Sequence, residues 1–270
     1  MKKFKFKKVT QVLLILAMAG ILISLFSGTS FALTGREIME RMDSQPVPKG
    51  SEGKLIMRLI SKTGGVRERI LQSYSKTENG LEKRYVKFLE PADVAGTSFL
   101  TLEQEKGSDL QYLYLPVLHK VRRIAARGKK GSFMGSDFTY KDMEAINIDE
   151  WKYRLLREEE YEERKCYVVE ATPADEEVLQ ETGYSKKISW IDSENFIVRK
   201  VEFYDETGNL LKVLTLEEYK LLAEKYWIAH KMTMKNVQTG HSTELIFRKM
   251  KVDVEIPDLY FTPRYLMRGG

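Results

Sequence analysis

The sequence predicts a mainly β (α+β) protein built on one large antiparallel sheet. We expect about eleven strands against two or three short helices. Turn residues recur between the strand segments at the spacing of a meander, and no repeat or low-complexity linker divides the chain after residue 32. An antiparallel sheet of this size curls rather than staying flat. It then either closes as a barrel or wraps around a helical plug, and both arrangements create an apolar interior that could hold a ligand.

The chain begins with the pattern of a secretory signal peptide. Five lysines precede an apolar run over 12–26, and Ser30-Phe31-Ala32 places small residues where a signal peptidase reads. We predict cleavage between Ala32 and Leu33, which gives a signal peptide, 1–32, and a domain, 33–270, that is periplasmic or otherwise exported. The alternative is an uncleaved membrane anchor, because the run is near the shortest length that spans a bilayer.

Removal of residues 1–32 changes the charge of the protein. The full chain has a formal net charge of +5, and residues 1–32 contain five lysines and no acid. Subtracting these five charges from +5 leaves the domain with a net charge of 0. The basic character therefore comes from the targeting segment, and no nucleic-acid partner is indicated. The single cysteine, Cys166, cannot form an internal disulfide, and we expect it to be a buried strand residue.

Short helices are expected at a few places in the domain. Thr34 and Glu37 have the spacing of a capping box at the start of a helix. Residues 140–144 are expected to form a second short helix, and 173–181 is either a loop or a helical turn. Residues 216–223 have helical propensity inside a strand-like run. The segments with strand character are 55–60, 66–74, 84–89, 96–102, 109–115, 117–124, 151–156, 165–171, 186–191, 196–204, 210–219, 227–237 and 243–254.

Residues 125–143, here called the flap, interrupt this strand pattern. The strand before it, 112–117, carries large apolar groups on both parities, so we expect both of its faces to be covered. The flap itself is basic, broken by glycines and aromatic at its end, which predicts a mobile segment with exposed apolar side chains. From apolar character and position we predict that an apolar pocket is lined by Phe99, Leu113, Leu115, Phe133, Met134 and Phe138.

Two further features could contact a lipid. Met232 and Met234 share a strand face and suit either core packing or a pocket for varied acyl chains. The cations beside the flap are either a solvated basic loop or a contact for an anionic headgroup. The residues predicted for the headgroup contact are Arg122, Arg123, Lys129 and Lys130.

The sequence shows no constellation typical of an enzyme or a metal site. His119, His230 and His241 are isolated and lack metal-ligand spacing. The glycines of 128–132 lack the order of a phosphate-binding loop, and no Gly-x-Ser-x-Gly elbow occurs. We therefore predict that the protein is not an enzyme and needs no cofactor and no metal. An exported hydrolase is opposed by the missing nucleophile–base pair.

Three stretches of the chain, 88–100, 114–140 and 256–263, resemble a LolA-like family whose members are commonly called outer membrane lipoprotein-sorting proteins. The resemblance covers nearly all of the domain. It implies an unclosed β-barrel, a strongly curved antiparallel sheet with short helices over its mouth, and an apolar cavity that takes acyl chains of lipoproteins or other lipids. It implies no catalysis and no metal. The chain departs from the true lipoprotein carrier by its greater length and by the long flap.

The resemblance leads to an expectation for function. The protein is expected to be a monomeric periplasmic carrier that shuttles lipoprotein or lipid cargo across the cell envelope. The lipoprotein carrier's partners, an inner-membrane transporter and an outer-membrane receptor, imply similar partners here. The alternatives are a ligand-sensing module of the same fold that regulates a membrane-anchored envelope partner, or a purely structural envelope protein.

Overall fold

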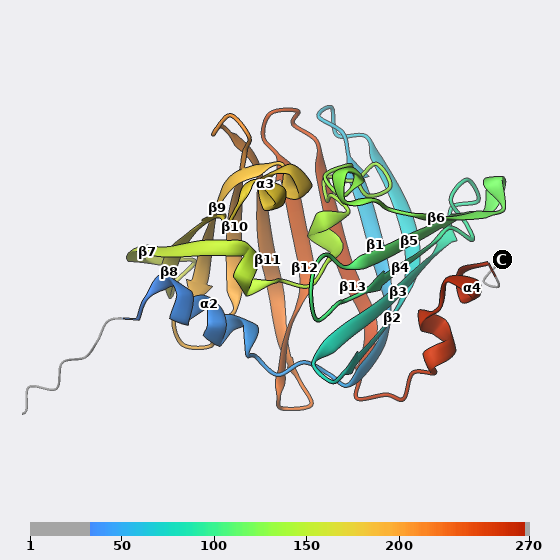
Figure 1. Ribbon diagram of the computed structural model, residues 1–270, viewed down its shortest axis with the longest axis horizontal. Helices are drawn as coiled ribbons and strands as arrows, with labels where there is room; N and C mark the ends of the chain where they lie inside the picture. The colour runs from blue at the N-terminus through green and yellow to red at the C-terminus, as the bar shows by residue number, and fades with distance from the viewer. Residues whose placement is uncertain (1–32, 268–270) are drawn as a thin grey trace, which may run out of the picture. The chain divides into compact units, whose positions relative to one another are not determined.

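One sheet of thirteen antiparallel strands makes up most of this computed structural model, which describes residues 33–267 (Figure 1). The predicted signal peptide, 1–32, lies outside the described residues. About eleven strands were expected, and each segment with strand character overlaps one of the thirteen. The strands are β1 (Gly50–Ile60), β2 (Val66–Glu78), β3 (Leu81–Glu90), β4 (Ser98–Leu102), β5 (Leu110–Leu115), β6 (Lys120–Arg123), β7 (Trp151–Tyr161), β8 (Arg164–Pro173), β9 (Tyr184–Asp192), β10 (Val198–Asp205), β11 (Leu210–Leu222), β12 (Tyr226–Asn236) and β13 (Ser242–Val252).

The strand order leaves two free edges. It runs β6-β5-β4-β3-β2-β1-β13-β12-β11-β10-β9-β8-β7, so the first strand pairs with the last. The edge strands, β6 and β7, are consecutive in the sequence but are not hydrogen-bonded to each other. The sheet is curved and does not close, which confirms the predicted unclosed β-barrel with a few short helices.

Alternating side chains give the sheet an apolar inner face. In β1, Leu55, Met57 and Leu59 are buried, and the residues between them are partly exposed. Leu55 lies opposite Leu71 of β2, and Met57 lies opposite Leu245 of β13. Because successive side chains of a strand point to opposite faces, this register gathers the buried residues of neighbouring strands on one side.

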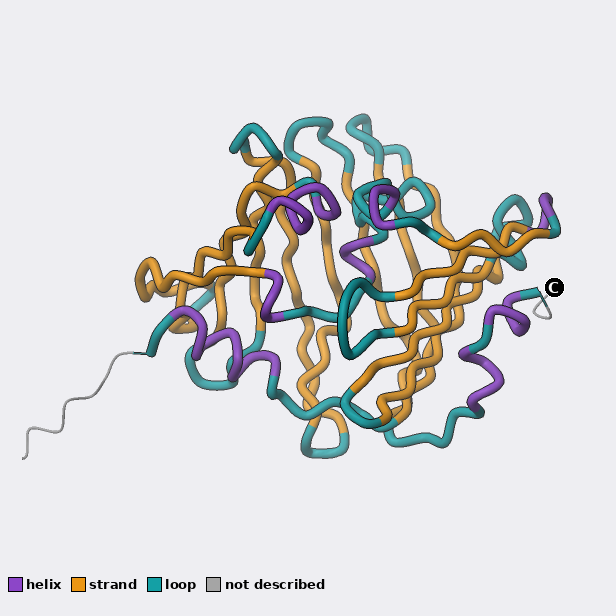
Figure 2. Tube along the Cα trace, in the orientation of Figure 1, coloured by secondary structure: helices purple, strands orange, loops and turns teal. Residues whose placement is uncertain are grey.

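The helical segments are short and lie outside the sheet's strands, some at its ends and some in front of its inner face (Figure 2). The predicted capping box is present: the Thr34 hydroxyl accepts from the Glu37 backbone, and the Glu37 carboxylate accepts from the Thr34 backbone. It begins α2 (Gly35–Asp43), whose buried Met39 and Met42 face the sheet beside β7 and β8. The other helical segments are α3 (Glu176–Thr182), α4 (Pro263–Leu266) and the 3-10 turns η1 (Pro116–Leu118), η2 (Ala126–Gly128), η3 (Lys141–Met143), η4 (Ile148–Glu150) and η5 (Asp258–Phe261).

Two segments differ from their sequence expectations. Residues 216–223 do not form a helix, because β11 continues to Leu222 in register with β12. Backbone pairing with a neighbouring strand thus overrides helix propensity. The expected strand 117–124 begins instead as the turn η1, since Pro116 has no N–H to donate to the sheet, and strand pairing resumes only in β6.

The two phenylalanines of the flap are buried, so the prediction that its apolar side chains are exposed is wrong for them. Phe133 is 1% exposed and Phe138 is 4% exposed. The reason is the topology: the chain must pass from edge strand β6 to edge strand β7, and it crosses the inner face of the sheet on the way (Figure 1). The glycine-rich turn at Met134 and Gly135, both with positive φ, aims the two phenylalanines at that face.

Polar contacts anchor the flap to the sheet at several points. The Arg69 guanidinium of β2 donates to the Met134 carbonyl at 2.6 Å, and the Gln111 amide of β5 donates to the Tyr140 carbonyl at 2.7 Å. Asp137 accepts from the Thr243 hydroxyl of β13 at 2.7 Å. These contacts come from β2, β5 and the central strand β13, so they tie the flap to one half of the sheet and to its centre.

The strongest anchor is a buried ion pair between Lys212 of β11 and Asp142 of η3. The Lys212 ammonium lies 2.7 Å from the Asp142 carboxylate and donates to the Asp137 carbonyl at 2.8 Å. The Tyr184 hydroxyl donates to the same carboxylate at 3.0 Å. Burial alone would raise the pKa of Asp142, but attraction to Lys212 and hydrogen bonds from Lys212 and Thr139 outweigh it and hold the pKa below its usual value.

We predict that Lys212→Met lowers the free energy of unfolding at pH 7 by about 3–5 kcal/mol, because it leaves the Asp142 carboxylate buried without its counter-ion. Urea unfolding would measure the change. The matched control is Arg154→Met, which removes an exposed partner of Glu170 and should cost less than about 1 kcal/mol. Equal effects of the two substitutions would show that the Lys212 pair is not an anchor.

The same pair predicts a pH dependence. A carboxyl with a depressed pKa contributes stability above its unfolded pKa of about 3.9 and loses it as the pH falls through the lower folded value. We therefore expect the stability difference between the wild type and Asp142→Asn to shrink as the pH falls below about 4. A difference that stays constant down to pH 2 would contradict the depressed pKa.

Candidate functional site

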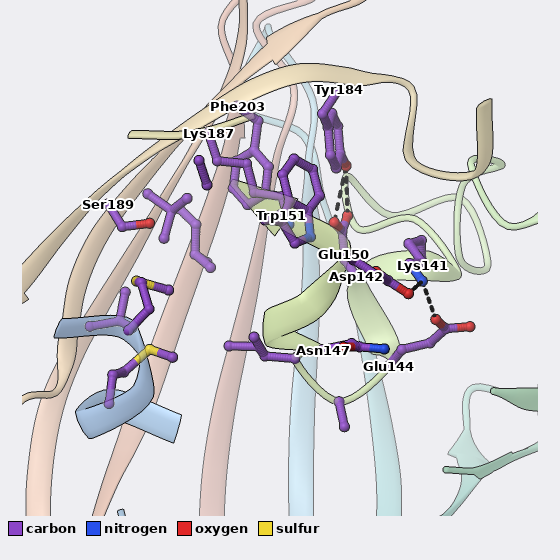
Figure 3. A pocket seen from close by; sticks show the side chains of 18 of the residues that line it. Lys141, Asp142, Glu144, Asn147, Glu150, Trp151, Tyr184, Lys187, Ser189 and Phe203 are labelled. Carbon is purple, nitrogen blue, oxygen red and sulfur yellow. Dashed lines mark hydrogen bonds and ion pairs between the residues drawn. The ribbon is translucent and has the colours of Figure 1, made fainter. Parts of the chain in front are cut away.

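A cavity of about 210 Å³ lies under the β7–β12 half of the sheet (Figure 3). Its walls are the inner face of these strands, helix α2 and the segment 138–150. Most of the lining is apolar. The apolar lining residues are Met39, Met42, Phe138, Ala145, Ile146, Trp151, Tyr153, Ala171, Tyr184, Val198, Val201, Phe203, Leu214, Leu216 and Met234.

The cavity is small for a whole lipid. Sites for drug-sized ligands usually measure about 300–1,000 Å³. The present volume suits part of one acyl chain, and a larger ligand would have to displace a wall. The walls that do not belong to the sheet include α2, which supplies Met39 and Met42, and the loop around Ile146, whose side chain is exposed.

An ion-pair network forms the polar side of the cavity. Lys141 lies 2.8 Å from Glu144 and 2.8 Å from Glu150 (Figure 3). Burial would lower the pKa of Lys141, but the two carboxylates outweigh it and raise the pKa above its usual value. Glu144 is also 2.5 Å from the buried Lys129. These ion pairs cross-link the segment 138–150, which forms one wall of the cavity.

Lys187 of β9 also lines the cavity, but unlike Lys141 it forms no ion pair within the described residues. Its ammonium lies 3.7 Å from the centroid of the Trp151 ring and 6.0 Å from that of Tyr184. Among residues 33–267 it has no carboxylate within ion-pair distance and no hydrogen-bond partner. Protein surrounds the side chain, yet the cavity leaves part of it accessible. Burial lowers the pKa of Lys187 to about 8, against the opposing effect of Asp142 and Glu150.

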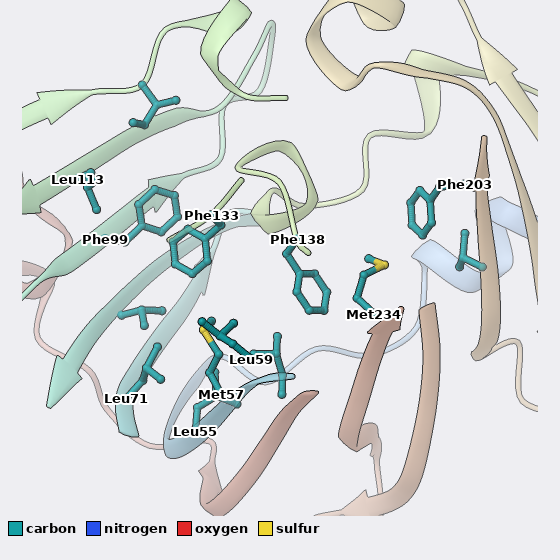
Figure 4. Packing of buried hydrophobic residues seen from close by; sticks show 14 of the residues in the cluster. Leu55, Met57, Leu59, Leu71, Phe99, Leu113, Phe133, Phe138, Phe203 and Met234 are labelled. Carbon is teal, nitrogen blue, oxygen red and sulfur yellow. The ribbon is translucent and has the colours of Figure 1, made fainter. Parts of the chain in front are cut away.

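The structure separates the six residues predicted to line a pocket. Phe138 lines the cavity. Phe99, Leu113 and Phe133 lie under the other half of the sheet, in a hydrophobic cluster that also contains Phe138, and Leu115 and Met134 pack against this cluster (Figure 4). In this cluster the Phe133 ring lies 5.0 Å from Phe99 between ring centroids. These five residues fill the inner face rather than line the cavity.

The four cations predicted for a headgroup contact do not form one patch. Arg122 and Arg123 are exposed on β6, and Lys130 is exposed but lies 2.9 Å from Glu206. Lys129 is 1% exposed, pairs with Glu144 and donates to the Asp109 carbonyl at 2.9 Å. The prediction of Lys129 as a surface cation is therefore wrong, because acidic and carbonyl partners distant in sequence surround it.

Sequence reasoning missed most of the cavity. Lys187 stands in the run Lys186-Lys187-Ile188-Ser189-Trp190. Polar and apolar residues occur on both faces of this strand, so its sequence does not indicate which face is buried. The Met234 lining was one of two interpretations left open for that strand, and the structure places this residue on the cavity. The weak alternation of β9 gave no signal for the direction in which Lys187 points.

Two kinds of feature are absent from residues 33–267. No group of three or more His, Cys, Asp or Glu side chains is placed to hold a metal ion. None of the helices in this part of the chain has the length and apolar run needed to span a bilayer.

Comparisons with known proteins give consistent results. A family described only as "Uncharacterized protein" matches residues 80–268. The chain is similar to a solved domain from Vibrio parahaemolyticus, designated an outer membrane lipoprotein-sorting protein. Identity is 36%, the TM-score is 0.81, and the match covers 87% of this chain and 98% of that one.

Two further solved structures have similar folds. One is a DUF1329 family protein from Desulfovibrio piger, with 28% identity, a TM-score of 0.80 and coverage of 86% of this chain and 97% of that one. The other is a LolA superfamily protein from Nitrosomonas europaea, with 22% identity, a TM-score of 0.67 and coverage of 87% and 100%. No curated protein matches the sequence.

We predict that Phe133→Ala lowers the free energy of unfolding by about 3–5 kcal/mol, because it opens a void in the packed cluster. Urea unfolding would measure this. The control is Leu118→Ala at a 65%-exposed position, which should cost under about 0.5 kcal/mol. A cost below about 1 kcal/mol for Phe133→Ala would show that the ring faces open space instead of packing.

Proposed function

Because the chain belongs to the LolA-like family of outer membrane lipoprotein-sorting proteins, we propose that it is an exported, non-catalytic carrier of acyl chains. Its cargo is a lipoprotein or a lipid, held in the cavity under β7–β12. It works between the membranes of the cell envelope and needs a donor, such as an inner-membrane transporter, and an outer-membrane acceptor.

The observation that carries this proposal is the apolar cavity inside an otherwise packed sheet. Each methylene group transferred from water to such a lining contributes about 0.8 kcal/mol. Methionine side chains adapt to ligands of different shape, and three of them, Met39, Met42 and Met234, line the cavity from two sides. Two of these belong to α2, so displacement of this helix is the simplest way to admit a longer chain.

The side chains near the cavity favour binding over catalysis. The carboxylates of Asp142, Glu144 and Glu150 are each held by a lysine within 2.8 Å. The one thiol, Cys166, is buried outside this cavity, and burial raises its pKa to about 11, so it stays protonated at neutral pH. Groups that are locked in ion pairs or protonated are poor general bases and nucleophiles.

The hairpin between β5 and β6 supplies a surface for contact with a membrane during transfer. At its tip Val117 is 87% exposed and Leu118 is 65% exposed. The following strand carries exposed Lys120, Arg122 and Arg123, which have no acidic partner within ion-pair distance among residues 33–267. Each cation near an anionic bilayer contributes about 1 kcal/mol of attraction, and exposed aliphatic side chains can enter the headgroup boundary.

We predict that the protein, purified gently from its own envelope fraction, retains a phospholipid or an acylated peptide. Native mass spectrometry would detect the bound mass. Ala171→Phe should lower the occupancy several-fold, because the ring fills the cavity, and a thermal melt would check that the variant is folded. A wild type that carries no ligand and takes up no fluorescent fatty acid would overturn the carrier proposal and favour a sensing or structural role.

We also predict that Val117→Asp combined with Leu118→Asp weakens binding to vesicles containing anionic phospholipid by about tenfold or more, since it removes apolar insertion and adds negative charge. Vesicle co-sedimentation would measure this. The control is Val66→Asp, at a 55%-exposed position at the start of β2. If both variants sediment like the wild type, the hairpin is not the membrane contact.

A further inference from the structure

Lys187 is placed to act as a recognition group inside the cavity. It lies on β9 opposite Ala171 of β8 and Phe203 of β10, and both of these neighbours line the cavity. In Figure 3 its side chain lies beside Trp151 and Phe203 at one end of the apolar lining. β9 is an internal strand of the sheet, so β8 and β10 fix the backbone of Lys187 on both sides.

The other lysines of this region already have partners. Lys141 is paired with Glu144 and Glu150, each at 2.8 Å, and lies 3.5 Å from Glu181. Lys212 is paired with Asp142 at 2.7 Å. Lys187 alone among the lysines that line the cavity has no acid within 4.0 Å in the described residues, so the carboxylates nearby are occupied by other cations.

An unpaired ammonium in an apolar cavity is costly. The Trp151 ring face offsets part of this cost through a cation–π contact. The remaining cost is consistent with the lowered pKa of Lys187, about 8 instead of 10.5. The groups that act on it are Asp142 and Glu150, which favour the charged form, and Lys141 and Lys212, which disfavour it. At neutral pH the ammonium is mostly charged and lacks a counter-ion.

We propose that Lys187 binds the anionic group, a carboxylate or a phosphate, of an amphiphile whose alkyl chain occupies the apolar part of the cavity. This inference rests on the proposed carrier function and adds the class of cargo. The cargo is an amphiphile whose one anionic group is bound by Lys187, rather than a neutral lipid. The anion supplies the missing counter-charge, and the chain lies along Val201, Leu214 and Met234. A charge-assisted hydrogen bond of this kind is among the stronger polar contacts in proteins.

Three probes with the same chain test the idea: dodecanoate, dodecyl phosphate and dodecan-1-ol. Isothermal titration calorimetry would compare the wild type with Lys187→Met, which keeps an unbranched side chain of similar length and removes its charge. We expect Lys187→Met to weaken binding of the two anions by about tenfold or more and to leave the alcohol unchanged. The relative affinities of the carboxylate and the phosphate identify which anion the site prefers.

Two further variants make the comparison specific. Lys187→Arg keeps a positive charge and should retain most of the preference for anions. Lys186→Met is the matched control, because Lys186 is the next residue of β9, on the opposite face, with its ammonium 4.4 Å from the Tyr204 ring centroid. It should bind all three probes like the wild type. Lys187→Met should also melt no lower than the wild type, because it removes an unpaired buried charge.

The outcomes separate this inference from the carrier proposal. If Lys187→Met binds the anions as tightly as the wild type, or weakens all three probes equally, Lys187 is not the anion contact, and the carrier function stands. If the wild type binds none of the probes, this inference is overturned, and the carrier proposal falls with it only if native mass spectrometry also finds no retained lipid or acylated peptide. In the wild type, the affinity for dodecanoate should be constant between about pH 6 and pH 8, where the ligand is ionised and Lys187 is mostly protonated, and fall above about pH 8, as Lys187 loses its proton.

Discussion

The fold depends on the ion pair by which Lys212 holds the flap inside the curved sheet. The sheet has an apolar inner face and two unpaired edges, β6 and β7, so its interior must be covered by the chain that joins these edges. That chain is polar and glycine-rich, and on its own it would stay in water. The buried pair with Asp142, together with the phenylalanines on either side of the glycine turn, makes the inner face its stable position.

The flap divides the interior into two unequal parts. Under β1–β5 its Phe133 packs against Phe99 and Phe88, and this half is filled. Under β7–β12, Phe138 is the aromatic side chain of the flap that lines the cavity. Met39 and Met42 of α2 also line this space. A packed half gives the rigidity that holds the sheet open, while the half under α2 keeps a volume that a flexible chain can enter. The same segment therefore both stabilises the fold and limits the cavity.

Several features of the fold were predictable because they are local. The capping box at Thr34, the strand segments and the turns between them follow from residues within a few positions of one another. The LolA-like resemblance added the unclosed barrel, which strand patterns alone left undecided. The strand expected over 210–219 extends to Leu222 despite the helical propensity of 216–223, because strand pairing with Tyr226–Met232 is a contact between segments, and such contacts override weak local preferences.

The candidate site was less predictable, for a physical reason. The sequence by itself determined an antiparallel sheet with an apolar face, a basic glycine-rich insertion and no catalytic constellation. Only the tertiary structure decided which charges are buried and which are free. The sequence around Lys129 and Lys187 does not distinguish their environments. Lys129 forms an ion pair with Glu144 inside the protein, whereas Lys187 lies over the Trp151 ring and has no acidic partner among residues 33–267. The state of a buried charge depends on counter-ions that the fold brings from distant segments, and a residue's sequence neighbours do not reveal them.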